Sequence, residues 1–451
     1  MTELVVVANR LPIQLLSKEF PIFTNSPGGL VSALHSILAA KGGTWVGWNG
    51  SYTNTILPFD FDYKLYSVEI DESNFRDYYD GFSNKILWPL YHELPYDLQF
   101  CSQWWRGYKK VNQIFAIKTA AVAKTDSSVW IHDYHLQLAP KILRQYRPDI
   151  RIGFFLHTPF PSFRTLKKMP RWREIVAGIS CSHIIGFQTM RDKQNFQIAL
   201  KNLELSSEGS LPAQPKIIVD PISIDFKIWS NRAQQPEIET LVRQIRDSIG
   251  IDKLLIVGID RLDLTKGILN RLLAFRELLT EQHVDPKQIA MVIVASTNRD
   301  SKNPNDEYRL CIQNLTFEIN NRFGEKTRPI VHLINTQITP TQVSALFVAA
   351  DILIVSSLKD GMNLVAKEFV ASSVNSRGML ILSKNTGAAL ELNAALQINP
   401  HDIDDIKNSI LAAIRMNEGE IIVRMQSMRQ IIQSHDVYDW AKRFLHVLQS
   451  T

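Results

Sequence analysis

Short apolar runs rich in β-branched residues alternate along the chain with longer stretches in which apolar residues recur at helical spacing. This alternation is typical of parallel sheets covered by helices on both faces. In the first half it predicts helices such as Leu30–Ala40 and Leu166–Ile179. The strands predicted there are Leu4–Ala8, Thr44–Gly47, Val129–His132, Ile152–Leu156, Ile184–Phe187 and Ile217–Val219.

The pattern loosens over Phe226–Pro236, where polar residues and a proline follow one another closely. We therefore predict a first domain over residues 1–228 and a second over residues 229–436. The amphipathic last segment, Val437–Thr451, is a candidate for a helix that returns to the first domain. The strands predicted in the second domain are Leu254–Ile259, Ala290–Ala295, Ile330–Ile334, Ile352–Val355 and Met379–Leu382.

These elements predict an α/β fold with two Rossmann-like, doubly wound domains. Such domains bind ligands at the carboxyl ends of their strands, so two of them facing each other would enclose an interdomain cleft. The length of 451 residues leaves room for two or three domains with their own cores.

Composition narrows the class of protein. The formal net charge of +5 comes from scattered Lys and Arg, which slightly favours small anionic substrates and does not favour nucleic acid. Three separate cysteines, Cys101, Cys181 and Cys311, are typical of a reducing cytoplasm and argue against structural zinc. No apolar run reaches the roughly 18 residues that span a bilayer. We expect a cytoplasmic protein without a membrane partner.

The stretch from Asp360 to Glu368 follows one predicted strand and opens a helix. Free backbone N–H groups at a helix start suit a diphosphate, and Glu368 lies where it can reach ribose hydroxyls. The alternative is an ordinary helix with Asp360 as its N-cap.

The stretch from Arg261 to Gly267 follows another predicted strand and supplies two cations, Arg261 and Lys266. Both suit the neutralisation of a departing diphosphate without a metal. The alternative is a surface loop with a solvated Arg–Asp pair.

Further polar groups follow the strands of the first half. Arg10 ends the opening strand, and Gly28 and Gly29 lead into a helix, where glycine lets a backbone approach a phosphate or sugar closely. No GxGxxG motif occurs, which argues against a dinucleotide enzyme. Each of these signals alone also fits a simple turn.

Two histidine-containing segments, His132–His135 and His157–Pro161, end successive strands. Their spacing falls on strand–loop junctions rather than on one helical face, so we expect hydrogen bonds to sugar hydroxyls rather than a metal site. Tyr79 and Trp88 belong to an aromatic run that suits stacking on a pyranose, although core packing is the usual role of such residues. Arg299 is one more cation after a strand.

What these residues share is their position just after predicted strands, the ligand-facing edge of a doubly wound fold. That position alone predicts a site for a phosphorylated, polyhydroxylated ligand. The residues are Arg10, Gly28, Gly29, Asp133, His157, Arg261, Lys266, Arg299 and Asp360.

Together the motifs resemble the trehalose-6-phosphate synthases, retaining glycosyltransferases of the GT-B architecture in glycosyltransferase family 20. The matching segments run in order from about residue 4 to the C-terminus. They are Val7–Arg10, Ser26–Leu30, Tyr79–Pro89, Trp130–His135, Gly153–Pro161, Arg261–Gly267 and Asp360–Glu368.

The resemblance implies glucose transfer from a nucleotide-glucose to glucose 6-phosphate, with no cofactor, no metal and the possibility of a homo-oligomer. It implies an acceptor site in the first domain, made of Arg10, Tyr79, Trp88 and Asp133, with Arg299 as a second phosphate ligand. The residues that it implies for the donor are Gly28, Gly29, His157, Thr158, Arg261, Lys266, Ile338, Asp360, Gly361, Met362, Asn363, Leu364, Val365, Ala366, Lys367 and Glu368.

The implied mechanism needs no protein nucleophile or general base, because the leaving phosphate oxygen takes the acceptor's proton on the same face. Among the implied site residues, Asp133, His157, Arg261, Lys266 and Asp360 are those expected to bear on catalysis. Glucosylglycerol-phosphate synthesis, cyclitol coupling and a silent sugar-phosphate sensor remain alternatives on the same fold.

The sequence departs from the family pattern at a few places. Leu264 replaces a commonly aromatic residue, and Ser357 and Lys359 replace Pro and Arg. Asp300 follows Arg299, and the stretch Leu205–Pro215 is short. These departures bear on the choice of nucleotide.

Overall fold

The computed structural model describes residues 3–15, 23–25, 28–52, 61–95, 98–205, 214–296, 306–325 and 328–451. The chain divides into two compact units, Met1–Ile222 with Val437–Thr451 and Ser223–Asp436. Arg299, Asp300 and most of Leu205–Pro215 lie outside the described residues. None of the helices in the described part combines the length and apolar character needed to cross a membrane.

The first unit is built on a parallel sheet whose strands are largely buried. Their order across the sheet is β5 (Lys64–Ser67), β4 (Thr44–Trp48), β1 (Leu4–Arg10), β6 (Ser128–His132), β7 (Arg151–Leu156), β8 (Ile184–Phe187) and β9 (Lys216–Val219). An antiparallel hairpin, β2 (Ile13–Leu15) and β3 (Phe23–Asn25), follows β1. All but the edge strand β5 and the hairpin were predicted. The prediction missed β5 because its four residues, Lys64–Ser67, include no β-branched residue.

Helices cover both faces of this sheet. Those of the first unit are α1 (Gly29–Lys41), α2 (Glu72–Phe75), a π-helix (Arg76–Leu87), α3 (Trp88–Tyr91), α4 (Ser102–Val122), α5 (Ala139–Tyr146), α6 (Phe163–Leu166), α7 (Trp172–Ser180), α8 (Met190–Glu204) and α17 (Val437–Gln449), with a 3₁₀ turn at Tyr134–Leu136. The single helix predicted over Leu166–Ile179 is wrong. It is two helices, α6 and α7, because Pro170 cannot continue the first one.

The second unit has a parallel sheet in the order of the nucleotide-binding doubly wound fold. The order is β12 (Val331–Ile334), β11 (Ile289–Ser296), β10 (Leu254–Arg261), β13 (Ile352–Val355), β14 (Met379–Ser383) and β15 (Leu396–Ile398). The chain starts in the middle of the sheet, moves to one edge, and then crosses back to build the other half. The three-residue edge strand β15 was not predicted.

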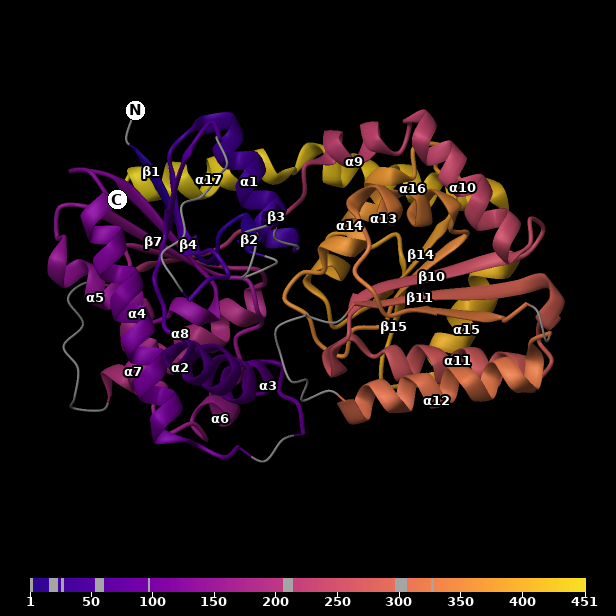
Figure 1. Cartoon of the computed structure of the whole chain (residues 1–451), viewed down its shortest axis with the longest axis horizontal. Helices are drawn as coiled ribbons and strands as arrows, with labels where there is room; N and C mark the ends of the chain where they lie inside the picture. The colour runs from indigo at the N-terminus through magenta and orange to yellow at the C-terminus, as the bar shows by residue number, and fades with distance from the viewer. Residues whose placement is uncertain are drawn as a thin grey trace. The chain divides into compact units, whose positions relative to one another are not determined.

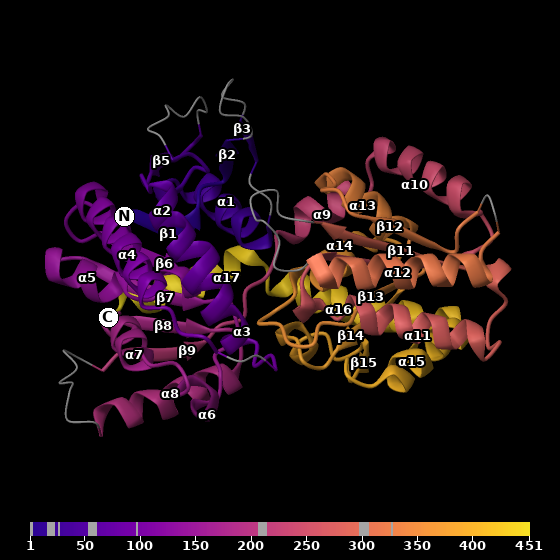
Figure 2. The ribbon, with the colours of Figure 1, turned by 60° about the horizontal axis from the view of Figure 1, so that its bottom comes forward.

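Two groups of helices lie on opposite faces of this second sheet (Figure 1). One group is α9 (Phe226–Arg232), α10 (Pro236–Ile249), α13 (Pro340–Ala349), α14 (Leu364–Ser372) and α16 (Glu418–Ser434). The other is α11 (Ile268–Thr280), α12 (Asp306–Phe323) and α15 (Ile403–Arg415). In Figure 2 the bottom of the view in Figure 1 comes forward, so that α11 and α12 lie in front. The 3₁₀ turns of this unit are Leu264–Lys266, Pro286–Gln288 and Gly387–Leu390.

The boundary between the units falls after Ile222 rather than after residue 228. The polar stretch that suggested residue 228 contains α9, which packs against both α14 and α13 of the second unit. The ring of Trp229 in α9 lies 5.8 Å from that of Phe347 in α13. Polar residues in this stretch therefore mark an amphipathic helix and not a linker.

The C-terminal helix α17 belongs to the first unit and lies against β6, β7 and β8 (Figure 1). Two glycines give its aromatic side chains room. A Cβ on Gly153 would lie 2.7 Å from the ring of Phe444, and one on Gly186 would lie 2.9 Å from it. Trp440 is fully buried, and its indole N–H donates to the Asp220 carbonyl at 3.1 Å.

We expect Gly186→Ala to lower the free energy of unfolding of the first unit by about 1–3 kcal/mol, the usual cost of overpacking a core. The added Cβ would lie 2.5 Å from the buried ring of Phe155. Gly419→Ala is the control, because its Cβ meets only the Asn417 side chain, at 3.4 Å. Urea unfolding followed by tryptophan fluorescence measures both. Equal midpoints for Gly186→Ala and wild type would contradict the packing described for α17.

Candidate active site

Both sheets have a switch point, where adjacent strands are followed by connections that leave in opposite directions. In the first sheet it lies between β1 and β6, and in the second between β10 and β13. Doubly wound folds bind their ligands at the carboxyl end of this point. Arg10 and Asp133 flank it in the first unit, and Lys266 and Asp360 follow the two flanking strands of the second unit.

In the first unit, Arg10 lies between two aromatic rings. Its guanidinium carbon is 5.6 Å from the ring centroid of Trp48 and 5.5 Å from that of Tyr79. Tyr79 comes from the π-helix and stacks on His135 with 5.6 Å between the ring centroids. Contacts of this kind orient a guanidinium over the faces of the rings.

Trp88 joins the same group of rings through Tyr134. Their centroids are 5.7 Å apart, and Tyr134 itself packs against His135 at 3.9 Å. Four predicted acceptor residues, Arg10, Tyr79, Trp88 and Asp133, are thus gathered at one edge of one sheet. The fifth, Arg299, lies outside the described residues.

Asp133 adopts a backbone conformation with φ +72°, which is strained for a residue with a side chain. Its Oδ1 accepts the backbone N–H groups of His157 and Thr158, both at 3.3 Å. The carboxylate therefore fixes the start of the loop that follows β7. The hydroxyl of Thr158 is buried and has no hydrogen-bond partner among the described residues.

Gly28 is the N-cap of α1 and has φ +130°, which only glycine adopts without strain. Among the described residues, no atom lies within 4 Å of where its Cβ would be. These residues therefore leave room for a phosphate or sugar at the helix start formed by Gly28 and Gly29.

In the second unit, the strongest interaction at the switch point is an ion pair. Lys266 Nζ lies 2.5 Å from Asp360 Oδ2, and both side chains are mostly buried. The same oxygen accepts from Asn363 Nδ2 at 3.1 Å and faces the Ser357 hydroxyl at 3.4 Å. The backbone N–H of Leu358 donates to the Thr265 carbonyl at 2.7 Å, which joins the two loops.

One expectation and one alternative for this region are wrong. Arg261 is the last residue of β10 and pairs with Ser296, because the strand runs two residues beyond the predicted Ile259. Asp360 is not a helix N-cap. The cap of α14 is Asn363, at φ +82°, whose side chain accepts from the Ala366 N–H at 3.1 Å.

The buried guanidinium of Arg271 is linked to the Lys266 loop through hydrogen bonds. Arg271 is fully buried and bonds Asp260 Oδ2 at 2.7 Å and the Ser356 hydroxyl at 3.2 Å. Ser356 Oγ lies 2.9 Å from the Gly267 carbonyl oxygen, to which it donates. Sequence reasoning missed this network. The only signal in the sequence was that polar residues, such as Asp260 and Ser356, stand at the ends of separate apolar strands.

The start of α14 is partly inaccessible. Met362, Asn363, Ala366 and Lys367 are buried, and Lys367 Nζ is bonded to Glu391 at 2.8 Å. The ammonium group of Lys367 is thus paired, so only its backbone could contact a donor substrate. Gly361 is buried, and Leu364, Val365 and Ile338 are half-buried. Ile338 precedes α13 in the loop after β12, at the same edge of the sheet.

Glu368 lies in the second turn of α14, and burial raises its pKa to about 7 while Arg232 of α9 acts in the opposite direction. Arg232 itself lies over the ring of Trp229, with the guanidinium carbon 4.9 Å from the ring centroid. A carboxyl that titrates near neutrality is suited to hydrogen bonds with hydroxyl groups in either protonation state.

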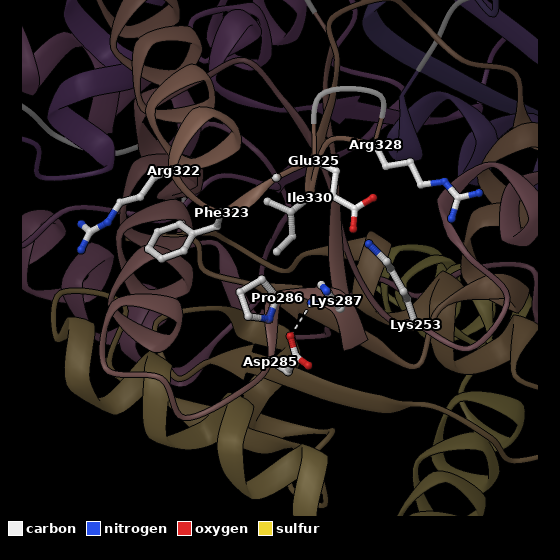
Figure 3. A pocket seen from close by; sticks show the side chains of 10 residues that line it. Lys253, Asp285, Pro286, Lys287, Arg322, Phe323, Glu325, Arg328 and Ile330 are labelled. Atoms are coloured by element: carbon white, nitrogen blue, oxygen red, sulfur yellow. Dashed lines mark hydrogen bonds between the residues drawn. The ribbon is translucent and has the colours of Figure 1, made fainter.

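A separate pocket of about 240 Å³ lies at the opposite edge of the second sheet (Figure 3). Lys253, Pro286 and Ile330 line it just before β10, β11 and β12 begin. It contains none of the predicted residues. Amino ends of strands are not where doubly wound folds bind their substrates, so we do not assign the site there.

Among the residues that the structure describes, no three His, Cys, Asp or Glu side chains gather as metal ligands would. His132 is buried at the end of β6, where its Nδ1 faces His157 Nε2 at 3.1 Å. In the segment His132–His135, the rings of the two histidines and of Tyr134 pack against other rings, and Asp133 holds the backbone of the next loop.

We expect Glu368→Gln to stabilise the protein relative to wild type at high pH. A folded-state pKa of about 7 against an ordinary 4.5 means that the native state binds the proton more tightly. The stability that wild type gains from this proton is fully present below pH 4.5. It is lost as pH rises through about 7, by roughly 3 kcal/mol in total. Thermal unfolding of both proteins between about pH 5 and 8 measures the difference. A difference independent of pH would contradict it.

Comparisons with known proteins agree with this geometry. The family model of glycosyltransferase family 20 matches residues 2–450. A trehalose-6-phosphate synthase of Mycolicibacterium smegmatis is 39% identical, over 100% of this chain and 93% of its own. A Burkholderia xenovorans α,α-trehalose-phosphate synthase (UDP-forming), solved with glucose-6-phosphate, has a TM-score of 0.91 at 30% identity, covering 99% and 100%.

An Escherichia coli structure bound with UDP-2-fluoro glucose has a TM-score of 0.88 at 30% identity, covering 100% of this chain and 99% of that one. These likenesses confirm the predicted GT-B class and the predicted family. The chain belongs to glycosyltransferase family 20.

Proposed function

We propose that this chain transfers glucose from a nucleotide-glucose to glucose 6-phosphate with retention of configuration, giving trehalose 6-phosphate and a nucleoside diphosphate. The observation that carries the proposal is the set of charged residues at both switch points, Arg10 in one unit and Arg261, Lys266 and Asp360 in the other. The relatives named above carry this activity in their names, and two were solved with the corresponding ligands or an analogue.

In this proposal the first unit binds the acceptor. The Arg10 guanidinium, oriented by Trp48 and Tyr79, takes the 6-phosphate, and Asp133 faces the sugar hydroxyls. A charged hydrogen bond between a guanidinium and phosphate is among the stronger ones in proteins. Arg299 is the proposed second phosphate ligand.

The second unit binds the donor. Arg261 and Lys266 take the diphosphate, the backbone of α14's first turn approaches the nucleotide, and Glu368 accepts from the ribose hydroxyls. Asp360, which Lys266 holds through its Oδ2, binds hydroxyls of the transferred glucose.

The bond changes are simple. The 1-hydroxyl oxygen of glucose 6-phosphate bonds to C1 of the donor glucose while the bond from C1 to the β-phosphate oxygen breaks. The proton of that hydroxyl passes to the leaving phosphate oxygen on the same face. Cations at the diphosphate stabilise charge that appears only as this bond breaks, so they lower the barrier rather than merely tightening binding.

Two properties of the site support a reaction without a protein nucleophile or base. Asp360 is held by Lys266, Asn363 and Ser357, and hydrogen bonds of this kind reduce the nucleophilicity of a carboxylate. Burial lowers the pKa of His157 to about 3, so this ring is a poor proton acceptor at neutral pH.

An assay of nucleoside diphosphate release tests the proposal. UDP-, ADP- and GDP-glucose are each supplied with glucose 6-phosphate, with glycerol 3-phosphate or with no acceptor. We expect release that depends on glucose 6-phosphate, and we expect it to persist in EDTA because no metal is proposed. Release that requires glycerol 3-phosphate, or none with any donor, would reject the assignment, and rescue by Mg²⁺ after EDTA would reject the metal-free mechanism.

We expect Lys266→Ala to lower kcat by about 10²–10³-fold, corresponding to about 3–4 kcal/mol, with a smaller effect on the donor KM. Arg261→Lys should also stay slow, because an ammonium cannot make the bidentate contact of a guanidinium. Lys287→Ala, an exposed cation at the opposite edge of the second sheet, is the control. Steady-state kinetics on variants with wild-type circular dichroism decide the matter. A Lys266→Ala enzyme with wild-type kcat would show that the loop is only structural.

A further inference from the structure

A continuous line of hydrogen bonds passes through His157 in the first unit. Gln188, just after β8, has its Oε1 2.9 Å from the Ile222 backbone nitrogen and its Nε2 3.2 Å from His157 Nδ1. On the other side of the ring, His157 Nε2 lies 3.1 Å from His132 Nδ1. Four segments that are distant in sequence thus meet in one line.

The direction of this line follows from its first member. A backbone N–H such as that of Ile222 can only donate, so the Gln188 atom facing it is the oxygen and the atom facing His157 is the NH₂ group. An NH₂ group donates, so His157 Nδ1 is an acceptor without a proton. The proton of the neutral ring is then on Nε2, which donates to His132 Nδ1.

The surroundings keep both rings neutral. Burial lowers the pKa of His157 to about 3 and that of His132 well below its usual range, with the neighbouring histidine adding to the latter. From the other side, α17 contributes the uncharged Trp440, whose ring centroid is 5.9 Å from that of His157. The nearby carboxylate, Asp133, accepts from the backbone N–H of His157.

Both ring nitrogens of His157 are therefore engaged within the protein, and its backbone N–H is held by Asp133. The ring can neither turn nor take up a proton without breaking this line. Gln188 is the member that sets the direction, since His132 alone would accept either tautomer of His157.

We propose that Gln188 is a positioning residue for glucose transfer. It holds His157, beside the transferred glucose, as a neutral ring whose Nε2 proton is donated to His132. This role rests on the function proposed above. Its chemical reason is that the anomeric carbon gains positive charge in the transition state of glycosyl transfer. A protonated His157 beside it would oppose that charge, whereas a fixed neutral ring does not.

Gln188→Glu tests the proposal because a carboxylate can still accept from Ile222 but cannot donate to His157. The proton must then move to Nδ1, and the pKa of His157 must rise toward neutrality. We expect kcat to fall by about 5- to 150-fold, the rate equivalent of about 1–3 kcal/mol, because the ring loses its fixed neutral form, with little change in either KM. Gln188→Met removes both contacts without adding charge and should slow the reaction without raising that pKa.

The direct readout is ¹⁵N NMR of the full-length protein labelled at histidine, with His157→Asn used for assignment. In wild type we expect an unprotonated Nδ1 and a protonated Nε2 that do not titrate between about pH 5 and 8. Gln397→Glu is the control, since the exposed Gln397 lies in the second unit, where its amide donates to the Ala389 carbonyl at 2.8 Å. It should change neither the spectrum of His157 nor kcat.

A wild-type His157 that carries its proton on Nδ1, or that titrates in this range, would overturn the tautomer assignment without any kinetic measurement. Unchanged kcat in both Gln188 variants, with the expected spectra, would overturn the positioning role. If the wild-type protein transfers no glucose to glucose 6-phosphate, the proposed function fails and the positioning role fails with it, while the spectra still decide the tautomer.

Discussion

The site depends on one constraint of parallel sheets, namely that connections leaving two adjacent strands in opposite directions cannot fill the space where those strands end. Each unit has one such point, between β1 and β6 and between β10 and β13. The side chains placed there differ in chemistry. The first unit places aromatic rings around the guanidinium of Arg10, and the second pairs the ammonium of Lys266 with the carboxylate of Asp360. This difference matches a sugar phosphate on one side and a diphosphate on the other.

The loops at these points are held in place because buried side chains form hydrogen bonds with their backbone groups. Asp133 accepts two backbone N–H groups of the loop after β7, and Ser356, held by the buried Arg271, donates to the backbone of the Lys266 loop. An unsatisfied buried polar group costs about 1–3 kcal/mol, so each loop has a single favourable arrangement. Binding energy is then available for the reaction instead of for ordering the loops.

Much of the fold could be predicted from the sequence because buried parallel strands are continuous apolar runs. The runs at Ile184–Phe187 and Ile352–Val355 were placed to the residue. The edge strands β5 and β15 were missed because their sequences lack that run: Lys64–Ser67 has no β-branched residue, and Leu396–Ile398 has only three residues. Pro170 was passed over, although proline ends helices for a local reason that the sequence already contains.

Most candidate site residues could be predicted because they follow those strands and match a family motif. Their partners could not. Arg271, Gln188 and Ser356 act through contacts over 11 to 85 positions of sequence, with Asp260, His157 and Arg271 respectively. Nothing in local spacing reveals which buried polar residue meets which loop. The capping of α14 by Asn363 was hidden for a related reason, since it requires a positive φ that Asn shares with only a few residues.

The stereochemistry of the product tests the central claim most directly. Proton NMR of the disaccharide phosphate formed from UDP-α-glucose and glucose 6-phosphate, recorded early in the reaction, reports the configuration at both anomeric carbons. Same-face departure and attack predicts α configuration at the transferred glucose. A β configuration there would mean attack from the opposite face of the ring and would contradict the account.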